Sequence, residues 1–103
     1  MKDFSLTNLN QVDVSSLAGS GVCGEVMVHN KFGLHARPAA QLVKLAQQYT
    51  SKISLKTANG EADAKSILDI LSLAAGPGVN IQVQVSGPDE RQALEAVIGF
   101  FEQ

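Results

Sequence analysis

The sequence predicts an α+β domain: an open-faced two-layer sandwich in which three helices cover one face of a four-stranded antiparallel sheet. Segments that alternate apolar and polar residues are interspersed with segments whose apolar residues recur at helical spacing, in the order β-α-β-β-α-β-α. Each strand-like segment alternates, so each strand has one face toward the core and one toward water. This pattern is typical of an antiparallel sheet that is covered on one side.

The chain has 103 residues, enough for one small domain with a single apolar core. Residues 1–21 lack a regular apolar period and end in the tripeptide Gly19-Ser20-Gly21. We therefore expect residues 1–21 to form a flexible N-terminal extension and residues 22–103 to form the domain.

The first half of the domain is expected to contain a strand, a helix and a hairpin. The strand begins at Val22, continues through Val26 and Val28, and is interrupted at Gly24. A helix is predicted over residues 36–48, where Pro38 is tolerated because it lies in the first turn. Residues 52–56 alternate as a strand, and the turn at Asn59-Gly60 returns the chain into a partner strand over residues 61–64.

The second half is expected to add a helix, a strand and a final helix. Ser66 suits the N-cap of the first of these helices, with Asp69 completing a short capping box, and the helix should end near Ala75. Residues 80–86 alternate without a fault. Pro88 suits the first position of the last helix. The residues expected to face the core from the last strand and helix are Ile81, Val83, Val85, Leu94, Val97, Ile98 and Phe101.

Composition excludes several classes of function. The formal charge is −2 and only eight residues are Lys or Arg, which argues against binding to nucleic acid or to an anionic membrane. The first residues lack the apolar block of a secretion signal and no segment approaches membrane-spanning length, so we expect a cytoplasmic protein. The single cysteine, Cys23, cannot form an intrachain disulfide, and we expect it to be buried in its strand. No Cys/His cluster has metal-ligand spacing, so no metal is expected.

A histidine at a predicted helix start is the strongest candidate for chemistry. His35 lies in the run Gly33-Leu34-His35-Ala36-Arg37-Pro38-Ala39. The first turn of a helix leaves backbone N–H groups unpaired and carries partial positive charge, as a transient phosphoryl group on the imidazole would require. His29 has no such context, and we interpret it as structural or solvent-exposed.

The chain resembles the histidine-containing phosphocarrier protein (HPr) family of the bacterial phosphoenolpyruvate-dependent phosphotransferase system. The resemblance rests on the run around His35, on the element order and on two later sequence segments. The later segments are Ala64-Lys65-Ser66-Ile67-Leu68 and Leu71-Ser72-Leu73. The resemblance covers residues 22–103, about four fifths of the chain. It implies a monomeric, stoichiometric phosphoryl carrier rather than an enzyme, with no cofactor.

The resemblance also implies a transfer cycle and its residues. His35 would accept a phosphoryl group on its δ nitrogen from phospho-Enzyme I, which is charged by phosphoenolpyruvate, and would pass it to an EIIA-type domain. The backbone N–H groups of Ala36 and Arg37 would hold phosphate oxygens, and the Arg37 guanidinium would add a planar fork of donors. Phosphoryl transfer depends mostly on positioning and charge stabilisation, so Arg37 should matter more for rate than for fold.

Ser66 has two interpretations that are compatible. As an N-cap it would stabilise its helix by about 1 kcal/mol. In many members of the family the matching serine is phosphorylated by an ATP-dependent kinase, the HPr kinase/phosphorylase. A dianion at a helix N-terminus is favourable, so this modification need not unfold the helix and would act on partners instead.

The predicted helix after Ser66 carries more apolar residues than one buried stripe requires. We expect Ile67, Leu68 and Leu71 to be partly exposed and to form a docking surface for Enzyme I and EIIA. Arg37, Lys44 and Lys65 would surround this surface with positive charge. The alternative is a helix wedged deep in the core.

Some residues depart from the family pattern. Phe32 replaces a small polar residue that in many members caps the helix or supports the histidine, so that interaction is lost or replaced. Asp69 stands where some members carry a lysine, which would weaken a basic docking surface. Lys31-Phe32-Gly33, Gly87-Pro88 and Val97-Ile98 resemble the nitrogen-related branch of the family. Two classes of function therefore stay open. One is a phosphoryl carrier, in sugar transport or in the nitrogen-related branch, and the other is a mainly regulatory binding module, in the nitrogen-related branch or controlled by phosphorylation at Ser66. The presence of His35 favours the carrier.

Overall fold

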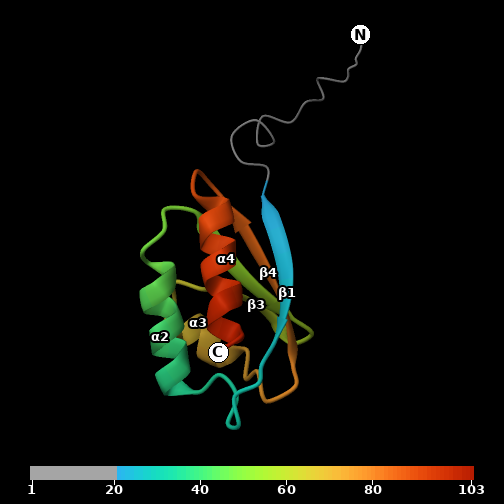
Figure 1. Cartoon of the computed structure of the whole chain (residues 1–103). Coiled ribbons are helices and arrows are strands. Elements are labelled where there is room, and N and C mark those ends of the chain that lie inside the picture. Colours follow the sequence, from blue (N-terminus) through green and yellow to red (C-terminus); the bar gives the residue numbers. More distant parts are fainter. Residues whose placement is uncertain (1–20) are drawn as a thin grey trace.

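The predicted sandwich is confirmed by the computed structural model, which describes residues 21–103. The predicted extension, residues 1–21, lies outside the described residues except for Gly21. The elements follow the predicted order: β1 (Val22–Met27), α2 (Ala36–Ala46), β2 (Lys52–Thr57), β3 (Gly60–Asp63), α3 (Ile67–Ser72), β4 (Asn80–Ser86) and α4 (Glu90–Phe101). All helices lie on the same side of the sheet, and α2 and α4 run side by side (Figure 1). No helix within residues 21–103 is long and apolar enough to cross a bilayer.

The sheet has the strand order β1-β4-β2-β3, and every neighbouring pair is antiparallel. β4 is a central strand, paired with β1 on one side and β2 on the other. Its strict alternation matches its burial, with polar residues exposed on the open face. The core between sheet and helices includes the completely buried side chains of Leu42, Ile53, Leu55, Ile70, Ile81, Val83 and Val97.

Two predictions about β1 are wrong. The strand runs without interruption through Gly24, because the missing side chain there makes room for α4: an added Cβ would lie 3.0 Å from Ile98 Cδ1 and 3.5 Å from Leu94 Cδ1. Leu94 and Ile98, which the sequence predicts to face the core, are half-buried where they approach Gly24. Cys23 is exposed rather than buried, because the alternation of β1 directs it to the open face of the sheet, opposite Gln84.

The helix after Ser66 is shorter than predicted. α3 ends at Ser72 rather than near Ala75, because Ala74 adopts a left-handed conformation with φ +50° and the chain turns away. Ser66 is confirmed as the N-cap, with its hydroxyl accepting a hydrogen bond from the Asp69 N–H at 3.3 Å. The capping box is incomplete, because the Asp69 carboxylate accepts the Asp63 N–H at 3.1 Å instead of the N–H of Ser66.

The start of α4 also differs from the prediction. Pro88 precedes the N-cap, which is Asp89, and the first helical residue is Glu90. The Asp89 carboxylate does not cap its own helix. It accepts the N–H groups of Thr50 at 3.0 Å and Ser51 at 2.9 Å and the Ser51 hydroxyl, which joins the start of α4 to the loop that follows α2. This cluster closes the end of the domain opposite the start of α2.

The Asp89 cluster predicts a loss of stability in acid. The Ser51 hydroxyl, followed by the backbone N–H of Thr50, lowers the pKa of Asp89 to about 2 from an ordinary value of 3.8. A depressed folded-state pKa contributes stability above the ordinary value, and this contribution is lost as the pH falls from about 4 toward 2. Urea unfolding of the wild type and Asp89→Asn should therefore differ at pH 6 and converge near pH 2. A difference that is unchanged at low pH would contradict the assignment.

Candidate functional site

His35 is the N-cap of α2, so the histidine lies at the boundary between loop and helix. Its backbone is extended, with φ −87° and ψ −170°, and its carbonyl accepts the N–H of Ala39 at 2.9 Å. The imidazole is exposed and makes no capping hydrogen bond. The ring therefore has an open approach from solvent, as a group that reacts with a larger protein requires.

The first turn of α2 leaves two backbone donors beside the histidine. The N–H of His35 itself is occupied, because it donates to the Gly33 carbonyl at 3.0 Å. Pro38 has no N–H, and Ala39 donates to His35. Ala36 and Arg37 are exposed, and their N–H groups have no intrahelical acceptor. The first turn contains no acidic side chain, so nothing within it opposes the attraction of this helix end for an anion.

The loop before His35 is fixed by contacts with the segment that follows α3. Gly33 has φ +76°, and an added Cβ would lie 2.5 Å from the Ala75 carbonyl oxygen and 2.8 Å from Gly76 Cα. The Leu34 N–H donates to that same Ala75 carbonyl at 2.9 Å. Only glycine fits at this approach without strain. The early end of α3 is thus part of the site, because it frees the Ala75 carbonyl to hold the histidine loop.

Phe32 contacts the histidine, which sequence reasoning missed. The rings of Phe32 and His35 are perpendicular, with centroids 6.0 Å apart and an interplanar angle of 84°. The Lys31 ammonium lies 5.6 Å from the centroid of the Phe32 ring. The sequence predicts that the polar interaction usual at this position is lost or replaced, and the ring contact is what stands in its place. No local pattern could have indicated the ring contact, which depends on the tight turn at Gly33.

The predicted docking residues on α3 are exposed to different degrees. Leu68 is 74% exposed, whereas Ile67 and Leu71 are 38% and 37% exposed. Ile70 is the residue of α3 that is completely buried. This distribution contradicts the alternative of a helix wedged deep in the core. We refer to Ile67, Leu68 and Leu71 as the α3 patch.

The three positive residues predicted to surround the α3 patch are spread along the domain, with Arg37 and Lys44 in the first and last turns of α2 and Lys65 shortly before α3. Lys44 is exposed in the last turn of α2, eight positions after Ala36 and therefore about 12 Å from it along the helix axis. The Lys65 ammonium is half-buried and donates to the Tyr49 carbonyl at 2.7 Å, beyond the end of α2. Of these three residues, Arg37 is the one that adjoins His35 in sequence. A further cation, Lys31, has its ammonium over the ring of Phe32.

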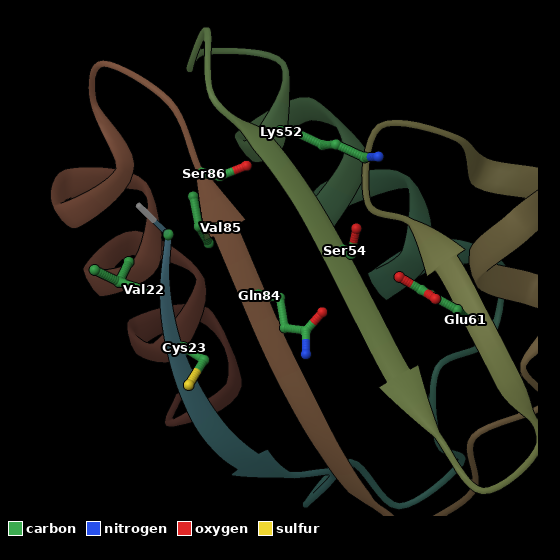
Figure 2. A pocket seen from close by; sticks show the side chains of 9 residues that line it. Val22, Cys23, Lys52, Ser54, Glu61, Gln84, Val85 and Ser86 are labelled. Atoms are coloured by element: carbon green, nitrogen blue, oxygen red, sulfur yellow. The ribbon is translucent and has the colours of Figure 1, made fainter. Parts of the chain in front are cut away.

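A shallow hollow on the open face of the sheet contains none of the predicted site residues. It is lined by β1, β2, β3 and β4, and Figure 2 shows Cys23, Lys52, Ser54, Glu61 and Gln84 around it. A second hollow lies between the histidine loop, the start of α2 and the end of α4; it is lined by His29, Leu34, Pro38 and Phe101 among others. His29 is exposed there. Within residues 21–103 no three His, Cys, Asp or Glu side chains are grouped to hold a metal.

Comparison with known proteins gives a consistent result. Residues 22–103 match the family model described as "PTS HPr component phosphorylation site". The chain is 42% identical over 78 residues to the phosphocarrier protein HPr of Xylella fastidiosa, covering 76% of this chain and 88% of that protein. It is also 42% identical over 77 residues to the phosphocarrier protein NPr of Escherichia coli K12, covering 74% of this chain and 86% of that protein.

A solved structure shares the architecture. The fold is similar to the crystal structure of a phosphocarrier protein HPr from Bacillus anthracis, with a TM-score of 0.76 and 38% sequence identity. The match covers 80% of this chain and 98% of the other. The similarity therefore extends over the whole sandwich, including the loop and helix that present the histidine.

Proposed function

Since the chain belongs to the HPr family of the phosphotransferase system, we propose that it carries a phosphoryl group on His35 from phospho-Enzyme I to an EIIA-type protein. It acts in the cytoplasm as a monomeric, stoichiometric intermediate and not as an enzyme. The observation that carries this proposal is an exposed imidazole at a helix N-cap, beside the unpaired N–H groups of Ala36 and Arg37.

In the proposed transfer, the lone pair of His35 Nδ1 attacks phosphorus. A P–N bond to His35 forms while the P–N bond to the donor histidine breaks, and the donor imidazole leaves. The N–H groups of Ala36 and Arg37 and the Arg37 guanidinium bind the oxygens, whose negative charge the positive end of α2 stabilises. A neutral imidazole is nucleophilic, and the P–N bond it forms is labile enough for onward transfer.

The relative from Xylella fastidiosa is named HPr and the relative from Escherichia coli is named NPr, and this chain is 42% identical to each of them. The proposal therefore concerns the phosphoryl relay itself, whether it serves sugar transport or the nitrogen-related branch. The test is incubation of the full chain with phosphoenolpyruvate and Enzyme I. An acid-labile, base-stable phosphoryl label on the chain is expected, and the complete absence of a label would overturn the proposal.

Ser66 is proposed as a regulatory phosphorylation site for an HPr kinase/phosphorylase. Its hydroxyl is half-buried at the N-cap of α3 and adjoins the α3 patch in sequence. The favourable helix end supports a phosphate there, whereas the carboxylates of Asp63 and Asp69, held beside it, oppose one. A modification at this position would therefore alter the charge next to the docking surface more than it would alter the fold.

The α3 patch is proposed as the docking surface for Enzyme I and EIIA, and Leu68→Asp tests it. A carboxylate in the centre of an apolar interface would be left unpaired on binding, so we expect transfer from Enzyme I to slow by about tenfold or more. Because Leu68 is 74% exposed, the free energy of unfolding should change by no more than about 0.5 kcal/mol. Transfer rates from Enzyme I and urea unfolding measure the two effects.

The matched control for Leu68→Asp is Gln84→Asp, which adds the same charge on the open face of the sheet, away from the helices. Transfer to Gln84→Asp should match that to the wild type. Unchanged transfer to a folded Leu68→Asp protein would exclude the α3 patch as the docking surface. Equal slowing in both variants would instead indicate a general effect of net charge.

A further inference from the structure

Within residues 21–103, Phe32 is the aromatic residue whose ring pairs with the imidazole of His35. The imidazole makes no capping hydrogen bond, and it is exposed. The perpendicular contact with Phe32, at a centroid distance of 6.0 Å, places a second ring beside an imidazole that no capping hydrogen bond holds. Perpendicular aromatic pairs at this separation are attractive, because the positive edge of one ring meets the negative face of the other.

The backbone fixes the position of Phe32 although its side chain is 72% exposed. The Gly33 N–H donates to the Asn30 carbonyl at 3.0 Å, which closes the turn that contains Phe32. The turn is held in place by the close approach of Gly33 to Ala75. Phe32 is thus an exposed ring on a constrained loop, and its contact with His35 does not depend on a mobile segment.

Lys31 restricts the Phe32 ring from a second direction. Its ammonium lies 5.6 Å from the ring centroid, within the range at which a cation is attracted to the face of an aromatic ring. The ring therefore contacts both the imidazole and a cation.

We propose that Phe32 is a positioning residue for His35: its ring holds the imidazole in one rotamer at the start of α2, beside the N–H groups of Ala36 and Arg37. The consequence for phosphoryl transfer rests on the proposed function, whereas the restriction of the imidazole does not. Restricting a nucleophile before the reaction raises its rate, because less rotational freedom is lost in the transition state. This restriction of the imidazole arises within the chain and does not require a bound partner protein.

The restriction of the imidazole can be measured in the isolated protein. Three-bond NMR couplings should show one dominant χ1 rotamer of His35 in the wild type and averaging in Phe32→Ala. Phe32→Tyr retains the ring and should behave as the wild type, whereas Phe32→Leu retains apolar bulk without the ring and should behave as Phe32→Ala. Wild-type couplings in Phe32→Ala or Phe32→Leu would overturn the proposal.

A small phosphoryl donor separates the effect of Phe32 on the reactivity of His35 from any effect on the docking of a partner protein. Phosphoramidate phosphorylates histidine directly, with transfer of its phosphoryl group to the ring nitrogen and release of ammonia, and needs no protein partner. We expect Phe32→Ala to react about two- to tenfold more slowly than the wild type with phosphoramidate, and Phe32→Tyr to be unchanged. Slowing with Enzyme I alone would mean that Phe32 is a docking residue and would overturn the positioning role. If wild type takes no label from phosphoenolpyruvate and Enzyme I, the proposed function fails, but the couplings and the phosphoramidate rates still test Phe32.

Discussion

Replacement of His35 with alanine is expected to abolish the acid-labile label that, under the proposed function, the chain takes from phosphoenolpyruvate and Enzyme I. No other group at the start of α2 is a nucleophile of the required kind, because Ala36, Arg37 and Pro38 follow it and the first turn has no acidic residue. The loss should be complete rather than partial, since the substitution removes the atom that forms the P–N bond. The label that remains on the chain is measured by electrophoresis at neutral pH, and acid treatment, which removes a phosphoryl group from histidine, identifies it.

The chain supplies its own control, because it contains two histidines. His29 is exposed and follows the end of β1, whereas His35 is the N-cap of α2, so His29→Ala should be labelled as fast as the wild type. The free energy of unfolding of His35→Ala should be within about 0.5 kcal/mol of the wild type, because the imidazole is exposed and caps nothing. A label that persists in His35→Ala and disappears in His29→Ala would move the acceptor to the other histidine.

The fold could be predicted from the sequence because most elements contain a local signal that tertiary packing does not override. The alternation of β4 and the apolar spacing of α2 both correspond to buried faces. The errors occur where a long-range contact decides. Cys23 looked like a buried small residue, yet pairing with Gln84 places it on the open face. Gly24 looked like a break, yet it is the position at which α4 approaches the strand.

The candidate site divides in the same way. A histidine before Ala36, Arg37 and Pro38 is a local signal, and the structure places it at the N-cap of α2 with an exposed ring. Two contacts of the histidine loop could not be predicted. The hydrogen bond from the Leu34 N–H to the Ala75 carbonyl joins segments that are far apart in sequence. The contact of Phe32 with His35 depends on the turn at Gly33, whose conformation is set by the same approach to Ala75. Lys65 is a further case. The sequence predicts an ammonium that is available to partners, whereas in the structure it donates a hydrogen bond to the Tyr49 carbonyl.

Replacement of Arg37 with glutamine is expected to lower kcat/KM for phosphoryl transfer from Enzyme I by about 100- to 1000-fold, the usual effect of removing a donor that stabilises developing charge. Arg37 is exposed at the second helical position, beside the N–H groups that would hold the phosphate. Arg37→Lys should recover part of the rate, because the ammonium restores the charge without the planar fork of donors. Single-turnover transfer measured with phospho-Enzyme I gives the rates.

Arg91→Gln is the matched control, because the chain contains two arginines and this one is exposed near the start of α4, at the end of the domain that the Asp89 cluster closes. Both variants lose one positive charge, so a general effect of net charge on the encounter with Enzyme I would slow them equally. A specific role predicts slow transfer to Arg37→Gln alone, with the free energy of unfolding of both variants within about 0.5 kcal/mol of the wild type. Normal transfer to Arg37→Gln would mean that the backbone N–H groups of Ala36 and Arg37, together with the helix end, suffice to bind the phosphoryl oxygens.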